Sequence, residues 1–290
     1  MLKRKNFNIK TILASALVYL QLLFMLAIVL YPILWMLGAA LSPVRGSPGM
    51  ALADGISVIP REITFANFQR LFDETNFTIW YRNTFTIATL TMIGTVIVHT
   101  FMGYVFARLQ FKGRKSGLLA ILILQMFPTF LALVAIYVIF LTFGLLDNIY
   151  ALVLIYVTGG IPFSIWLVRG YMLNIPKSLD EAAYIDGATK LQVFTKVIFP
   201  MSVPIISFIA FNSFIGPWMD FILPQVVLRS SANRTLAMGL FELANHNELT
   251  YDITAFTAGS LIVGTPIAIL YFALQRYLLT GISAGANKGE

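Results

Sequence analysis

Six long apolar runs, nearly free of charged side chains, dominate this 290-residue sequence. A helix needs about 20 mostly apolar residues to cross the hydrocarbon core of a membrane, and every run is close to that length or longer. The runs therefore predict an all-α integral membrane protein with six transmembrane helices and both termini on the same side. They cover residues 11–41, 84–107, 117–143, 150–168, 201–224 and 255–274.

Composition excludes the other broad classes of protein. Hydrophobic residues make up 58% of the chain and charged residues only 11%, whereas a soluble domain is about 25% charged. Disorder requires low hydrophobicity and high charge, so it is excluded as well. The chain has no cysteine, and His99 and His246 are too few and too far apart to predict a metal site.

The basic residues predict the orientation of the chain. Fourteen of the 20 lysines and arginines fall on one side of the six runs, and the positive-inside rule places that side in the cytoplasm. The net charge of +7 is therefore an orientation signal and does not indicate nucleic-acid binding. The predicted cytoplasmic parts are the N-terminus 1–10, the loops 107–116 and 169–200, and the tail 276–290.

The first apolar run is too long for a signal peptide, whose apolar core has about 7–15 residues. We therefore expect an uncleaved first span at 11–41, an extracytoplasmic loop at 42–82 and a core of five spans in 83–290. Within the loop, Phe65, Phe68 and Phe72 have the spacing of a short amphipathic helix at the membrane interface.

Several features needed for independent energy coupling are missing from the sequence. No G-x-x-x-x-G-K-[ST] phosphate-binding loop is present. No lysine or arginine lies in the middle of a run, and Asp220, near the outer end of the fifth, is the one acid expected to be buried. A partner that supplies the energy is therefore favoured, with a stand-alone secondary carrier or a structural membrane-assembly protein as alternatives.

The cytoplasmic loop 174–200 carries strong local signals. Ser178 with Glu181, after Pro176, and Thr189 with Gln192 have the spacing of two capping boxes. Gly187 stands where a left-handed helix cap is expected. The loop therefore predicts two short helices joined by a glycine elbow, a compact knob suited to docking into another protein. The second helix has one apolar stripe and is expected to end at Pro200; the stripe comprises Leu191, Phe194, Val197 and Ile198.

The same loop has a longer pattern, which reads Glu181-Ala182-Ala183, three residues, Gly187, nine residues and Val197-Ile198-Phe199-Pro200. This pattern resembles the EAA motif in permeases of binding-protein-dependent ABC importers, whose usual form ends in Ile-x-Leu-Pro. Other segments are similar to the MalG-type sugar permeases of that class. They are Phe106–Leu109, Gln125–Pro128, Gln275–Leu278 and Gly281–Gly289.

This resemblance implies a type I ABC importer permease fold and a chain that is not itself an enzyme. It implies no cofactor on this chain, with ATP and Mg on a partner ATPase dimer. The other implied partners are a MalF-type second permease subunit and an extracytoplasmic sugar-binding protein. The implied substrate is a maltose- or maltodextrin-like oligosaccharide, and the location is the cell membrane. The implied ATPase-coupling residues are Glu181, Ala182, Ala183, Asp186, Gly187, Ala188 and Pro200.

Glycines and prolines are expected to interrupt the later spans. They occur at Pro128, Gly159-Gly160-Ile161-Pro162, Gly216-Pro217, and Gly264 with Pro266. Irregular backbone in a membrane is tolerated where it is buried in protein or lines a wet cavity. We expect the third to sixth spans to form a cavity wall, although plain packing kinks remain an alternative. The candidate residues of a translocation path are Gly159, Gly160, Pro162, Asn212, Trp218 and Asp220.

Three further polar features can be interpreted from the sequence. Trp218 and Asp220 also fit an interfacial aromatic belt beside a capped helix end. His99 is expected to form a hydrogen bond between helices. The outer segment 229–254 is either a contact with the sugar-binding protein or a plain solvated loop; its polar residues include Asn233, Asn245, His246 and Asn247.

Overall fold

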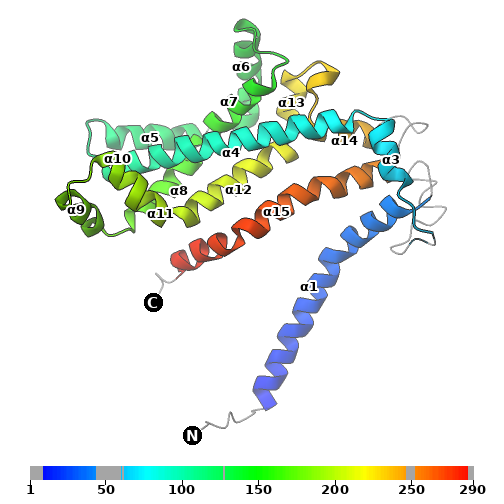
Figure 1. Ribbon diagram of the computed structural model, residues 1–290, viewed down its shortest axis with the longest axis horizontal. Helices are drawn as coiled ribbons and strands as arrows, with labels where there is room; N and C mark the ends of the chain where they lie inside the picture. Colours follow the sequence, from blue (N-terminus) through cyan, green and yellow to red (C-terminus); the bar gives the residue numbers. More distant parts are fainter. Residues whose placement is uncertain (1–8, 44–59, 61, 127, 246–251, 287–290) are drawn as a thin grey trace. The chain divides into compact units, whose positions relative to one another are not determined.

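The computed structural model describes residues 9–43, 60, 62–126, 128–245 and 252–286, and in these residues it contains helices and no strands (Figure 1). Three helices are long and apolar enough to span a membrane, and three bent pairs each pass the same test together. The prediction of an all-α chain with six spans is therefore confirmed. The long helices are α1 (Ile9–Leu41), α4 (Phe77–Arg108) and α15 (Ile253–Ala286).

The bent pairs correspond to the third, fourth and fifth apolar runs. The third run forms α5 (Arg114–Gln125) and α6 (Thr129–Thr142), and the fourth forms α7 (Ile149–Gly159) and α8 (Ile161–Leu173). In the fifth, a helical stretch over Lys190–Met201 meets α12 (Val203–Met219) at a bend of 78°. The interruption expected at Gly159-Gly160 is confirmed by the 47° bend between α7 and α8.

Two other expected interruptions are wrong. α12 continues through Pro217 to Met219, and α15 runs without a break through Pro266. Packing with neighbouring helices and local adjustments let a membrane helix accommodate a proline. Towards its C-terminal end, the fifth run breaks at Asp220 instead of at Gly216-Pro217. The backbone of Asp220 is extended, and its side chain accepts a hydrogen bond at 3.2 Å from the N–H of Leu223 in the first turn of α13 (Ile222–Val227).

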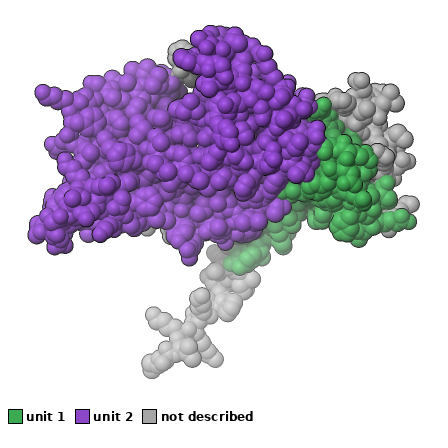
Figure 2. All heavy atoms as spheres, turned by 45° about the horizontal axis from the view of Figure 1, so that its top comes forward, with its two compact units in different colours: residues 1–75, 242–262 green, residues 76–241, 263–290 purple. Residues whose placement is uncertain are grey.

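The chain forms two compact units, coloured separately in Figure 2. The first comprises residues 1–75 and 242–262. Within it, α3 (Ala66–Asp73) is held by Asn67, whose amide donates to the carbonyls of Ala40 and Ser42 at 2.8 Å each. Phe65 and Phe72 of the expected interfacial helix are exposed, which fits a helix whose apolar side faces lipid.

The second unit comprises residues 76–241 and 263–290 and is organised around α4, which packs along α7, α8 and α12. α4 approaches α8 closely at Gly103, where an added Cβ would lie 2.4 Å from Cγ1 of Val168 in α8. The absence of a side chain at Gly103 therefore lets the two helices touch. One buried cluster near the loop 174–200 includes Tyr104, Ala107, Val168, Met172, Ile175, Val193, Ile198 and Ile209.

Part of the outer segment is helical, because α14 (Leu236–Asn245) forms within the expected polar loop 229–254. Asp147, with a φ of 58°, joins the α6–α7 turn to this segment by accepting from the backbone N–H of Arg229 and Ser230 at 2.9 and 3.0 Å. Burial raises the pKa of this carboxyl, but these hydrogen bonds outweigh burial and lower the pKa to about 2. His246, Asn247, the N-terminal basic cluster and Lys288 lie outside the described residues.

Candidate functional site

The loop 174–200 folds into the two-helix knob that the sequence predicts. α9 (Lys177–Ile185) and α10 (Lys190–Val193) are joined at Gly187, whose φ of +81° is left-handed. The N–H of Ala188 donates to the carbonyl of Ala183 at 2.9 Å, and that of Gly187 donates to the carbonyl of Tyr184 at 3.0 Å. These bonds satisfy carbonyls at the end of α9, as a left-handed glycine cap does.

One of the two predicted capping boxes is present. The hydroxyl of Thr189 accepts from the N–H of Gln192 at 3.3 Å, and the N–H of Thr189 donates to Oε1 of Gln192 at 2.7 Å. The box at Ser178 is wrong, because α9 starts at Lys177 directly after the extended Pro176 and makes no side-chain cap. Ser178 already lies inside the first turn, where its hydroxyl cannot take the capping position.

The sequence predicts that the helix after the elbow ends at Pro200, and this prediction is wrong. The helix continues as a π turn over Phe194–Ile198 and then as α11 (Phe199–Met201), and the chain bends only before α12. A π turn is one of the local adjustments by which a membrane helix accommodates a proline. Within the expected stripe, Ile198 is buried, Phe194 and Val197 are half-buried and Leu191 is exposed.

The residues expected to couple to an ATPase lie on or near this knob, which forms one end of the second unit in Figure 1. Glu181, Ala182, Asp186 and Gly187 are exposed, and Ala183 and Ala188 are half-buried. Pro200 is also exposed but lies in α11, outside α9 and α10. Large apolar side chains accompany them, since Ile185 is 86% exposed and Leu191 is 63% exposed. Large exposed apolar side chains on a polar loop of this kind are typical of a surface that contacts another protein.

The structure adds one buried ionic contact to this loop that the sequence did not predict. Asp180 in α9 is 8% exposed, and its Oδ2 lies 3.0 Å from Nε of Arg108, the last residue of α4. Burial raises the pKa of the Asp180 carboxyl, and the Arg108 guanidinium opposes that shift. Nothing local in the sequence links Arg108 to an acid 72 positions further along the chain.

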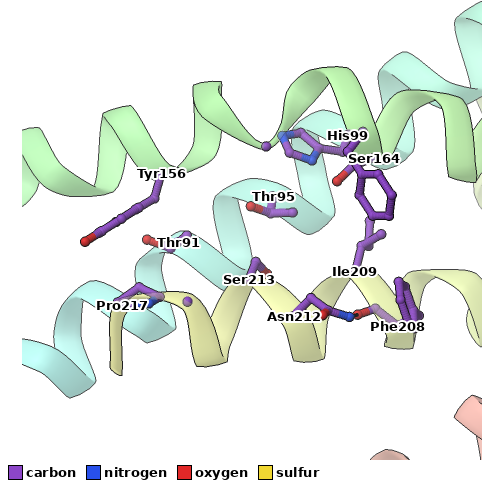
Figure 3. A pocket seen from close by; sticks show the side chains of 13 residues that line it. Thr91, Thr95, His99, Tyr156, Ser164, Phe208, Ile209, Asn212, Ser213 and Pro217 are labelled. Atoms are coloured by element: carbon purple, nitrogen blue, oxygen red, sulfur yellow. Dashed lines mark hydrogen bonds between the residues drawn. The ribbon is translucent and has the colours of Figure 1, made fainter. Parts of the chain in front are cut away.

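A cavity of about 230 Å³ lies in the membrane-spanning part of the second unit. Figure 3 shows side chains from α4, from α7 and α8, and from α12 around it. Its polar lining is uncharged, apart from the titratable ring of His99; it includes Thr91, Thr95, His99, Tyr156, Ser164, Asn212 and Ser213. A neutral, hydroxyl-bearing solute or water suits these groups better than an ion does.

His99 confirms the expectation of a hydrogen bond between helices, because its Nε2 lies 2.8 Å from the carbonyl of Val157 in α7. A carbonyl can only accept, so Nε2 carries the proton and Nδ1 is left as an acceptor. Nδ1 is buried and has no hydrogen-bond partner among the described residues. Gly160 leaves room for the ring, since a Cβ there would lie 3.1 Å from Cε1 of His99.

The six candidate path residues do not share one cavity. Gly160 and Asn212 line the cavity of Figure 3, and a second cavity of about 360 Å³ is lined by Gly159, Gly160 and Asp220. Pro162 and Trp218 line neither cavity. Trp218 is 3% exposed and packs edge-on against Tyr81, with ring centroids 5.5 Å apart.

Tyr156, which the sequence did not single out, lines both cavities. Its hydroxyl donates to Oδ2 of Asp220 at 2.9 Å. This bond holds the extended break after α12 against α7. The described residues contain no group of three His, Asp or Glu side chains arranged to hold a metal ion.

Comparison with known proteins identifies the class of this chain. The profile described as "Binding-protein-dependent transport system inner membrane component" matches residues 99–283. The galactooligosaccharides permease GanQ of Bacillus subtilis is 39% identical over 84% of this chain and 86% of its own length. The maltodextrin permease MdxG of the same organism is 40% identical over 78% and 81%. A bacterial ABC transporter that imports the polysaccharide alginate has the same fold, with a TM-score of 0.80 at 23% identity over 94% and 99% of the two chains.

Proposed function

We propose that this chain, which belongs to the family of inner-membrane components of binding-protein-dependent transport systems, is the permease subunit of an ATP-driven importer of maltodextrin-like oligosaccharides. The observation that carries this function is the knob 174–200, because it presents exposed apolar side chains around a glycine elbow. A knob of this kind is suited to follow the closure of an ATPase. The substrate assignment rests on relatives such as MdxG, named for maltodextrin, and GanQ, named for galactooligosaccharides.

The remaining partners follow from the same proposal. An ATPase dimer binds ATP and Mg and contacts Glu181, Ala182, Ala183, Asp186, Gly187, Ala188 and Pro200. A MalF-type second permease subunit completes the pathway, and an extracytoplasmic sugar-binding protein delivers the oligosaccharide. The excess of basic residues on one side of the spans supports a cytoplasmic location for both termini and the knob.

Reconstitution of the complete transporter tests this function. The chain is placed in liposomes with its second permease subunit and ATPase dimer, and the sugar-loaded binding protein is added. We expect uptake of labelled maltodextrin that requires ATP, with galactooligosaccharides as the first competing sugars. Uptake driven by an ion gradient without the ATPase would instead support a secondary carrier and overturn the proposal.

We also propose that the two cavities are parts of the translocation path, with Gly159, Gly160, Asn212 and Asp220 on its surface.

Single cysteines at Gly160, Ser164 and Asn212 are expected to react with a water-soluble maleimide in at least one state of the transport cycle. Their reactivity should change when a non-hydrolysable ATP analogue is added, since alternating access opens the path to one side at a time. The chain has no native cysteine, so the background is low. A cysteine at Ile165, which is fully buried, is the matched control. If the cysteines around Gly160 stay unlabelled in every state, these positions do not belong to the path.

A further inference from the structure

We propose that the ion pair between Arg108 and Asp180 is the point at which the coupling knob is attached to α4, and that α4 relays the knob's movement to the membrane cavity. Arg108 and Asp180 are positioning residues in this proposal, because neither needs to touch the sugar or ATP. The inference rests on the proposed function, since it assumes that the knob follows an ATPase.

The first step is the geometry of the pair. Side chains of Arg108 and Asp180 are only 4% and 11% exposed, and Nε lies 3.0 Å from Oδ2. Nη2 of the same guanidinium donates to the carbonyl of Ile175 at 2.8 Å. The Arg108 side chain at the end of α4 therefore contacts both the segment that leads into α9 and the first turn of α9 itself.

The second step is that α4 contacts the other half of the knob as well. Tyr104 lies one turn before Arg108 on the same face of α4, and its hydroxyl donates to the carbonyl of Lys190 in α10 at 3.2 Å. Its ring centroid lies 4.9 Å from that of Phe194, which follows α10 directly. Residues 104 and 108 thus connect α4 to both arms of the elbow at Gly187.

The third step is that α4 leads without interruption to the cavity. It is a single helix from Phe77 to Arg108, and Thr91, Thr95 and His99 line the cavity from one of its faces. Arg108 is nine positions after His99, a distance of about 14 Å along the helix axis. Its last turn is also fixed by Arg169 and Arg114, which donate to the carbonyls of Phe106 and Ala107 at 3.2 Å each. A displacement of Arg108 is therefore carried along a stiff element to the cavity wall.

Energetics favour a positioning role over a purely stabilising one. An apolar pair of similar volume is usually as stable as a buried ion pair, whereas removal of one partner leaves an uncompensated buried charge. An ion pair adds the condition that α9 must sit in one register, because a shift separates the charges. Replacement of both charged residues by apolar ones should therefore change the position of α9 more than the stability of the protein, and this difference can be measured.

The test uses the complete transporter in liposomes, with sugar uptake per ATP hydrolysed as the readout and the amount of assembled complex measured in parallel. The double variant Arg108→Met with Asp180→Leu removes both charges and keeps apolar volume. We expect it to assemble like the wild type but to import at least about tenfold less sugar per ATP, the effect of a change of about 1.4 kcal/mol. Lys112→Met, which removes an exposed charge four residues after Arg108, is the control and should change neither value.

Asp180→Glu keeps both charges, so it leaves no uncompensated buried arginine; its longer side chain shifts α9 relative to Arg108, and it provides the second variant if the double variant fails to assemble. It too should hydrolyse ATP with at least about tenfold less uptake per ATP. Wild-type uptake per ATP in an assembled variant would overturn the inference and leave the proposed function intact. A wild-type transporter without ATP-driven uptake would overturn the proposed function itself.

Discussion

Replacement of Gly187 with valine is expected to abolish most ATP-driven uptake while the ATPase stays active. Gly187 has a φ of +81°, and nothing lies within 4 Å of the position of an added Cβ. The expected effect therefore comes from the backbone and not from a clash, because a β-branched residue in the left-handed region costs about 1–3 kcal/mol. The elbow relaxes to another conformation, α9 and α10 lose their relative orientation, and uptake per ATP falls at least about tenfold, equivalent to about 1.4 kcal/mol.

Two variants separate this effect from general instability. Gly187→Asn tolerates the left-handed conformation and should retain most uptake. Gly144→Val introduces the same kind of strain, at a φ of +65° and also with nothing within 4 Å, but in the turn between α6 and α7. Gly144→Val should lower stability without changing uptake per ATP. Normal coupling in Gly187→Val would mean that the elbow does not transmit force.

Replacement of Gly103 with alanine should sharply reduce the amount of assembled transporter. The new Cβ would lie 2.4 Å from Cγ1 and 2.8 Å from Cβ of Val168, which is fully buried. Because Val168 has no space to move into, α4 and α8 must separate, and overpacking of this kind costs about 1–3 kcal/mol. The measurements are the yield of complex on size-exclusion chromatography and its thermal unfolding temperature in detergent.

A second substitution provides the check on this explanation. Val168→Ala removes both γ-methyl groups, so Gly103→Ala with Val168→Ala should assemble better than Gly103→Ala alone, a non-additive result expected only of residues in contact. Gly170→Ala is the control: Gly170 lies in α8, as Val168 does, but nothing lies within 4 Å of its added Cβ, so this substitution should be nearly neutral. Equal losses from Gly170→Ala and Gly103→Ala would show that the contact with Val168 is not the cause.

The places where local signals failed share a physical cause. Ser178 with Glu181 has the spacing of a capping box, but α9 begins directly after Pro176, two residues too early for Ser178 to be the capping residue. Gly216-Pro217 and Gly264 with Pro266 read as breaks, but α12 and α15 pass through them. In each case the local signal describes which cap or helix break a short segment favours by itself, and contacts with the neighbouring chain decide whether that cap or break forms.

The sequence by itself determined the six spans, the helical class, the glycine elbow and the cap at Thr189. These features depend on hydropathy over about 20 residues or on hydrogen bonds between residues a few positions apart, so they can be read along the chain. Only the tertiary structure decided that Asp180 is buried against Arg108, that Tyr156 joins two cavities, and that Trp218 is packed away from both. Those contacts join residues more than 60 positions apart, and they form only because the helices α4, α7, α8 and α12 pack together and α4 contacts the knob 174–200.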